Sequence, residues 1–138
     1  RKDYFSKNFV TLLDIAPTLY DFGEINLKNN NPNFPLEGYS LKKYLNGESN
    51  QIHEKGYVFG FEHSGYSFIM RDNWKLVNYK TPFNIKNFKL YNLEIDPIEE
   101  VDLKEKEVEI FNQLIKEWEI FSKKNKLIFP TPYIDNIN

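Results

Sequence analysis

The sequence contains no cysteine and only two histidines among its 138 residues. The absence of cysteine excludes disulfide bonds, thiolate metal sites and a cysteine nucleophile within these residues. The chain also lacks a large excess of either charge, because it has 18 basic and 20 acidic residues and a net charge of −2. Without a basic field, the chain is not expected to bind nucleic acid or an anionic membrane surface. No apolar run approaches the roughly 20 residues that cross a bilayer.

Aromatic residues are abundant and make up 17% of the chain, within a hydrophobic content of 41%. A chain of this length can bury roughly two-thirds of its unfolded surface, which is enough for one core. From Tyr57 onward, apolar and polar residues alternate in short runs, as is typical of strands. The chain begins at Arg1 rather than at methionine, and we expect it to be part of a longer protein.

The first 50 residues predict a short extended run at Phe9–Leu12, followed by helix and loop. Asp14 can cap the start of a helix and Gly23 can end it. Ser40 to Gly47 predicts one or two further helical turns. In the first helix, the residues at spacings of three and four are expected to bury one face: Ile15, Thr18, Leu19 and Phe22.

Residues 51–138 predict a second region, a four-stranded antiparallel meander followed by a long helix. The strands are expected at residues 57–63, 66–71, 74–80 and 88–93, with tight turns at Ser64-Gly65 and Asp72-Asn73. The helix is expected to begin near a capping box of Asp102 and Glu105. Its apolar face is expected to hold Trp118, which should share one core with Trp74.

Four segments, taken in order, resemble the C-terminal region of the sulfatase family, the arylsulfatase-like branch of the alkaline-phosphatase superfamily. They are DIAPTLYDFG at Asp14–Gly23, LEGYSLKKYLNG at Leu36–Gly47, FEHSGYSFIMRDNWKLVNY at Phe61–Tyr79 and KLYNLEIDPIEEVDL at Lys89–Leu103. The resemblance implies an α+β fold. A small antiparallel sheet of about four strands would pack against the long C-terminal helix, after a short strand-helix segment belonging to a larger α/β catalytic domain.

The resemblance also implies hydrolysis of sulfate esters, by a formylglycine made from a Cys/Ser-x-Pro-x-Arg motif beside a calcium ion. That motif does not occur in this chain. Calcium and formylglycine are therefore expected in an N-terminal catalytic domain, which would be the partner of this chain. This chain is expected to hold no catalytic or metal-binding residue, to be inactive alone, and to leave the surface that the missing domain covers apolar, around Phe9–Leu13 and Ile15–Phe22.

The sequence is compatible with more than one function. The substrate would be a sulfated small molecule or a sulfated glycan, and family resemblance implies a periplasmic or secreted protein. A related phosphodiesterase or phosphonate hydrolase is an alternative, because the C-terminal region is similar across these chemistries. A non-catalytic carbohydrate-binding module is another, and aromatic residues exposed on a sheet face would favour it.

Glu62 and His63, beside the first hairpin turn, are the candidate substrate-binding residues. In the sulfatases that the sequence resembles, loops of this region contribute to the rim of the substrate pocket. Arg71 and Lys75 could bind an anion but are expected to be solvated strand residues. His53 is expected to be solvated in a polar loop, because its sequence neighbours offer no second ligand.

Overall fold

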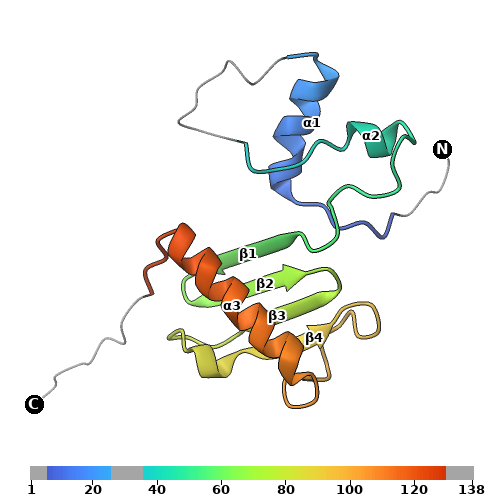
Figure 1. Cartoon of the computed structure of the whole chain (residues 1–138). Coiled ribbons are helices and arrows are strands. Elements are labelled where there is room, and N and C mark those ends of the chain that lie inside the picture. The colour runs from blue at the N-terminus through green and yellow to red at the C-terminus, as the bar shows by residue number, and fades with distance from the viewer. Residues whose placement is uncertain (1–5, 26–35, 130–138) are drawn as a thin grey trace, which may run out of the picture. The chain divides into compact units, whose positions relative to one another are not determined.

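The computed structural model describes residues 6–25 and 36–129. The chain divides into two compact units, residues 1–55 and 56–138. Figure 1 shows helices and loops in the first unit, and a sheet with one long helix in the second. This is the α+β fold that the sequence predicts.

The first unit contains a 3₁₀ turn η1 (Leu12–Asp14), helix α1 (Ile15–Phe22) and the short helix α2 (Lys42–Leu45). Gly23 ends α1 as predicted, because its N–H reaches the carbonyl of Leu19 at 2.9 Å. The expected extended run at residues 9–12 is not a strand, since no described strand lies beside it and Leu12 already belongs to η1.

Within this chain α1 does not bury the apolar face that its spacing predicts; residues 15–22 instead leave an exposed apolar surface, as the resemblance implied. Thr18 is buried, whereas Ile15, Leu19 and Phe22 are 47%, 67% and 48% exposed. The spacing of these residues is correct for one helix face, but no apolar layer of the described chain covers that face.

The second unit is built on a four-stranded antiparallel sheet in the order β1-β2-β3-β4, as the sequence predicts. The strands are β1 (Val58–His63), β2 (Tyr66–Arg71), β3 (Trp74–Asn78) and β4 (Lys89–Asn92), with a 3₁₀ turn η3 (Ile85–Asn87) before β4. Positive φ angles at Ser64, Gly65 and Asp72 form the two predicted tight turns.

Helix α3 (Val108–Lys124) lies across one face of the sheet (Figure 1). Trp118 is 2% exposed in a core that strands β2, β3 and β4 share with the helix, and half-buried Trp74 packs against this core, as predicted. Gly60 allows the helix to approach β1, because a Cβ there would lie 2.7 Å from the Phe121 ring. The fully buried or nearly buried core residues are Ile69, Leu76, Phe88, Leu90, Leu114 and Trp118.

The predicted start of the long helix at Asp102 is wrong, because α3 begins at Val108. The Asp102 carboxylate instead accepts the backbone N–H of Leu90 and of Lys104, each at 3.1 Å. The Leu103 N–H also reaches the carbonyl of Leu90 at 2.8 Å. These bonds hold the segment against β4, so the helix can start only after it.

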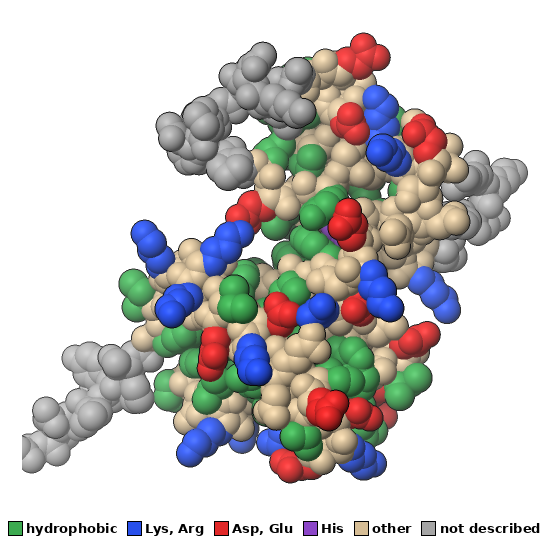
Figure 2. Space-filling model, in the orientation of Figure 1, with side chains coloured by type: hydrophobic (Ala, Val, Ile, Leu, Met, Phe, Trp, Pro, Cys, Tyr) green, Lys and Arg blue, Asp and Glu red, His purple; other side chains and the backbone are tan. Residues whose placement is uncertain are grey.

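The outer side of α3 carries charges of both signs without a block of either, which Figure 2 shows as mixed blue and red. Among the described residues, no helix has the length and apolar character needed to cross a membrane. The exposed charged residues of α3 include Glu109, Lys116, Glu119, Lys123 and Lys124.

Candidate functional site

The carboxylate of Asp14 is the most enclosed polar group of the first unit, with 0% exposure. Its Oδ2 accepts the backbone N–H of Thr11 at 2.7 Å, and its Oδ1 accepts that of Tyr39 at 2.8 Å. Nearby, the Thr18 hydroxyl donates to the Asp14 carbonyl at 2.6 Å and accepts the Leu41 N–H at 2.9 Å. Asp14 and Thr18 therefore tie the start of α1 to residues 39–41.

His53 completes this arrangement, and the prediction that it is solvated is wrong. Its side chain is 7% exposed, and Nε2 lies 3.1 Å from Asp14 Oδ1. The ring also lies beside those of Phe9 and Tyr39, with centroids 5.9 and 5.2 Å away. The prediction failed because Asp14 is 39 residues away in the sequence. The polar residues next to His53 in the sequence do not indicate this contact.

Two opposing influences act on the pKa of Asp14. Burial raises it, but the hydrogen bonds from the backbone of Tyr39 and Thr11 and from His53 together lower it below its ordinary value of 3.8. The carboxylate is therefore ionised near neutral pH, and Nε2 of His53 is the donor in the bond between them. Because Asp14 is enclosed and already accepts four hydrogen bonds, its geometry suits a structural anchor rather than a general base.

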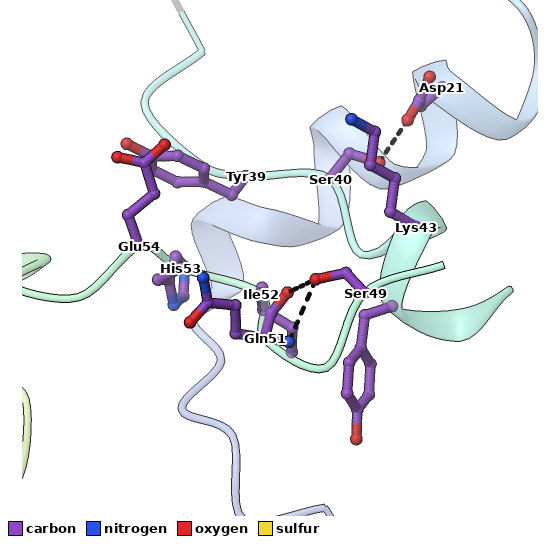
Figure 3. A pocket seen from close by; sticks show the side chains of 10 residues that line it. Asp21, Tyr39, Ser40, Lys43, Ser49, Gln51, Ile52, His53 and Glu54 are labelled. Carbon is purple, nitrogen blue, oxygen red and sulfur yellow. Dashed lines mark hydrogen bonds between the residues drawn. The ribbon is translucent and has the colours of Figure 1, made fainter. Parts of the chain in front are cut away.

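A cavity of about 320 Å³ lies beside this anchor, within the first unit. In Figure 3, Tyr39, Ser40 and Lys43 line one side, and the loop through Ser49, Gln51 and His53 lines the other. Its polar groups are partly engaged already: the Ser40 hydroxyl donates to Asp21 at 2.6 Å, and that of Ser49 to the Gln51 carbonyl at 2.7 Å. Across the parts of the chain that the structure describes, no group of three or more His, Cys, Asp or Glu residues could hold a metal ion.

The candidate residues Glu62 and His63 lie at the tip of the β1–β2 hairpin. The Glu62 carboxylate accepts the Gly65 N–H at 2.8 Å, which stabilises the turn. His63 is exposed and lies opposite Tyr66 in the β1–β2 register. Successive residues of a strand point to opposite faces, so Glu62 lies on the α3 side and His63 on the other. Their contact with a substrate stays a prediction.

A charged cluster on the sheet face opposite α3 was missed by the sequence reasoning. Lys75 Nζ lies 2.6 Å from Glu99 Oε1, with side chains only 18% and 16% exposed. The Tyr79 hydroxyl donates to the other oxygen of Glu99, and Lys75 Nζ lies 5.0 Å from the centre of the Phe68 ring. Burial, and then Glu99, raises the pKa of Tyr79.

Lys75 and Arg71 are therefore engaged in ion pairs. The prediction of a solvated strand residue is wrong for Lys75, which is 18% exposed, whereas the Arg71 side chain is 33% exposed. Arg71 Nη1 lies 2.6 Å from Glu117 of α3. Both acidic partners are more than 20 residues away in the sequence. Alternation places Lys75 on the second sheet face, but the strand pattern does not identify Glu99 as its partner.

Comparison with known proteins relates this fold to sulfatases. No protein-family model matches the sequence. The carrageenan sulfatase Ps i-CgsB, solved in complex with k-i-k-neocarrahexaose, aligns with a TM-score of 0.66 and 20% identity, over 86% of this chain and 25% of that chain. A second structure of Ps i-CgsB aligns with a TM-score of 0.65 and 20% identity, with the same shares covered.

A 6S-sulfatase of Bacteroides thetaiotaomicron, solved in work on the metabolism of multiple glycosaminoglycans, aligns with a TM-score of 0.61 and 16% identity. The alignment covers 86% of this chain and 26% of that chain. The chain thus spans about a quarter of the length of the structures it matches. At these identities the likeness concerns the fold, and that fold is the one expected for the C-terminal region of a sulfatase.

Proposed function

We propose that this chain is the C-terminal part of a sulfuric ester hydrolase, in which it supports the catalytic domain and contributes to the rim of the substrate pocket. The observation that carries the proposal is the structural match to sulfatases over 86% of the chain. The match extends beyond the sheet and α3, because residues 56–138 alone could not account for that share.

The chemistry of this enzyme lies outside the chain in this proposal. A formylglycine and a calcium ion would be held by the N-terminal catalytic domain. The described residues offer no cluster that would hold the metal, and no Cys/Ser-x-Pro-x-Arg motif occurs in the sequence. The role of this chain is therefore to support the catalytic domain and to contribute to substrate recognition, and by itself it would release no sulfate.

A sulfated glycan is the substrate class that we favour, in an exported enzyme. Support comes from the matched proteins, one solved with a neocarrahexaose and one described with glycosaminoglycan metabolism. On this chain, Glu62 and His63 are the proposed rim residues. The exposed His63 can donate hydrogen bonds to hydroxyls or sulfate, and Glu62 holds the turn that presents it.

The test is sulfate release by the longer protein that contains this chain. Sulfate would be measured by ion chromatography after incubation with carrageenan oligosaccharides and with glycosaminoglycan fragments, and we expect release from at least one of them. The 138-residue chain alone serves as the control without catalytic parts. Hydrolysis of bis(p-nitrophenyl) phosphate without release of sulfate from any substrate would contradict the proposal and identify the protein as a phosphodiesterase instead.

One observation favours a second candidate, glycan binding by the chain itself. On the sheet face opposite α3, Phe61 is 50% exposed and its ring stacks on that of Phe68, with centroids 5.7 Å apart. Exposed rings on a sheet can stack against sugars. Affinity electrophoresis of the chain in carrageenan gels, with Phe61→Ala as the comparison, would detect such binding; equal mobility with and without glycan would reject it.

A further inference from the structure

A second cavity, of about 280 Å³, lies within the second unit, between the turn that joins β2 to β3 and the first half of α3. Its volume is just below the range of about 300–1,000 Å³ that is typical of small-molecule sites. It therefore suits a ligand of one ring. We call it the Trp74 cavity, and it is lined by Arg71, Asp72, Trp74, Ile110, Gln113 and Leu114.

Trp74 gives this cavity an aromatic surface and an unused hydrogen-bond donor. The residue packs against the core but is only partly buried. Its indole N–H has no acceptor among residues 6–25 and 36–129, and it is not one of the enclosed atoms left without a partner. Solvent therefore reaches this group. A tryptophan ring can cover the apolar face of a sugar while its N–H binds a hydroxyl.

Gln113 and Asp72 add hydrogen-bonding groups of both kinds. Gln113 is exposed on α3, and its side-chain amide makes no hydrogen bond within the described part of the chain. Asp72 accepts the Gly56 N–H through Oδ1 at 2.8 Å, and no described residue donates to its Oδ2. An amide both donates and accepts, whereas a carboxylate only accepts. A ligand with several hydroxyl groups can bond to both.

Arg71 is held at the cavity from two sides. Its Nη1 lies 2.6 Å from Glu117 Oε1. Its Nη2 lies beside Gly56, where a Cβ would be 3.2 Å away. Gly56 has a positive φ of 83°, so a larger residue there would be strained and would crowd the guanidinium. A guanidinium that is already fixed lowers the cost of ordering the site when a ligand binds.

The charges around the cavity select the class of ligand. The cation Arg71 is paired with Glu117, and Asp72 adds a second carboxylate, so a sulfate would meet repulsion rather than a free cation. A metal ion would lack ligands, because no group of three or more His, Cys, Asp or Glu among the described residues could hold one. An apolar ligand would leave Asp72 and Gln113 unpaired. These exclusions leave an uncharged ligand that carries hydroxyl groups.

We propose that the Trp74 cavity binds one uncharged sugar unit, with the sugar ring against Trp74 and its hydroxyl groups bonded to Gln113 and Asp72. The site lies on the α3 side of the sheet, whereas Phe61 lies on the opposite face. The inference goes beyond the proposed function, because binding here requires neither a sulfate group nor catalysis. In an enzyme that acts on glycans, a site for unsulfated units would keep the protein on its polymer.

The experiment titrates the 138-residue chain with the methyl glycosides of galactose, glucose and mannose and follows tryptophan fluorescence. The chain has two tryptophans, and Trp118 is enclosed in the core, so a ligand in the cavity changes the signal of Trp74. For at least one glycoside we expect saturation with a Kd of about 1 mM, the strength typical of a ligand this small. The 6-sulfate of the same sugar should bind about tenfold more weakly, because of the negative charge around the cavity. Calorimetry on the longer protein should give the same Kd.

Gln113→Ala should weaken binding by about tenfold, the equivalent of one lost hydrogen bond. Asn112→Ala is the matched control and should leave the Kd unchanged, because Asn112 is the neighbouring exposed amide on α3 and does not line the cavity. Trp74→Phe keeps an aromatic ring but removes the N–H, and calorimetry should show a loss of similar size. Circular dichroism of each variant checks that it is folded, and the comparison of residues 112 and 113 decides the question even if Trp74→Phe does not fold.

Three results would overturn the proposal. They are the absence of saturation by any glycoside at about twentyfold above the expected Kd, a 6-sulfate that binds as tightly as its parent sugar, and equal effects of Gln113→Ala and Asn112→Ala. Loss of binding in the longer protein would also overturn it, because the cavity would then be closed there. None of these measurements records sulfate release, so the sugar site and the proposed activity can fail independently.

Discussion

The two units of this chain bury different kinds of side chain. Residues 56–129 enclose an apolar cluster around Trp118, with ion pairs such as Arg71–Glu117 outside it. In the first unit the most enclosed side chain is the Asp14 carboxylate, while Leu12 and Leu19 face outward. The difference indicates that the second unit buries its own core, whereas the first is held together largely by hydrogen bonds and leaves these apolar residues exposed.

This contrast also separates what each unit needs for stability. Apolar burial stabilises in proportion to the area removed from water, so the second unit can be stable by itself. Hydrogen bonds contribute less net free energy, although a broken one leaves a costly unpaired group. The first unit should therefore be the less stable of the two, and sensitive to single polar changes.

The largest effect is expected from Trp118→Ala in the second unit. Trp118 is 2% exposed and contacts the rings of Phe88 and Phe121, with centroids 5.4 and 5.6 Å away. Its removal should lower the free energy of unfolding by about 3–5 kcal/mol. Urea unfolding followed by circular dichroism measures this, with Ile120→Ala as an exposed control on the same helix; an unchanged midpoint would contradict the core assignment.

Gly38→Ala should break the first unit and leave the second intact. A Cβ at Gly38 would lie 1.9 Å from the carbonyl oxygen of Leu13, so the backbone must move apart. We expect a loss of about 3 kcal/mol, seen as faster hydrogen exchange at the amides of Tyr39 and Leu41. Both tryptophans lie in the second unit, so the fluorescence transition should stay where it is. A shift of that transition would show that the units unfold together.

Asp14→Asn tests the anchor and its response to pH. The amide cannot replace an ionised acceptor of four hydrogen bonds, and we expect a loss of about 2 kcal/mol. Because the folded pKa of Asp14 lies below 3.8, the wild-type stabilisation is complete above about pH 5 and is lost as the pH falls through 3.8 and below.

Exchange at the Thr11 and Tyr39 amides, measured from pH 6 to pH 3, should report this loss in the wild type, after correction for the intrinsic pH dependence of exchange. Asp14→Asn should lack the pH-dependent component. If wild type and variant showed the same pH profile, Asp14 would not be the group responsible for the pH-dependent loss of protection.

The smallest effects concern the hairpin tip. In the longer protein, His63→Ala should lower kcat/KM for the sulfated substrate by about tenfold, the equivalent of one lost hydrogen bond. Glu62→Ala should act through the turn, with a smaller loss. His53→Ala, in the first unit, is the comparison for a general loss of stability. Unaltered kinetics for both hairpin variants would reject their place at the substrate.

The sequence predicted the second unit well because its signals are local. Alternation in 57–71 and the turn residues Ser64-Gly65 specify the first hairpin, and spacing on the long helix identifies Trp118 as a core residue. The start of α3 was misplaced because a tertiary contact, Asp102 with the Leu90 N–H, competes with capping. Local pattern cannot represent such a competition.

The anchor and the charged cluster could not be predicted for the same reason. His53 reaches Asp14, and Lys75 reaches Glu99, across 39 and 24 residues of sequence. Nothing near His53 or Lys75 in the chain distinguishes it from a solvated side chain. For α1 the spacing was correct, but whether a face is covered depends on what packs against it, which the periodicity of one helix does not contain.

The order of the strands has a consequence for synthesis on the ribosome. Each strand pairs with the one before it, so a nascent chain can assemble the meander as soon as β4 has emerged. Helix α3, however, follows the meander in the chain, and until Trp118 has been translated the side chains of Ile69 and Leu76 lack their cover. A premature stop codon after Asn92 would therefore yield a sheet whose strands are paired but whose apolar face is exposed. Such a chain is expected to aggregate, to bind chaperones or to be degraded by proteases.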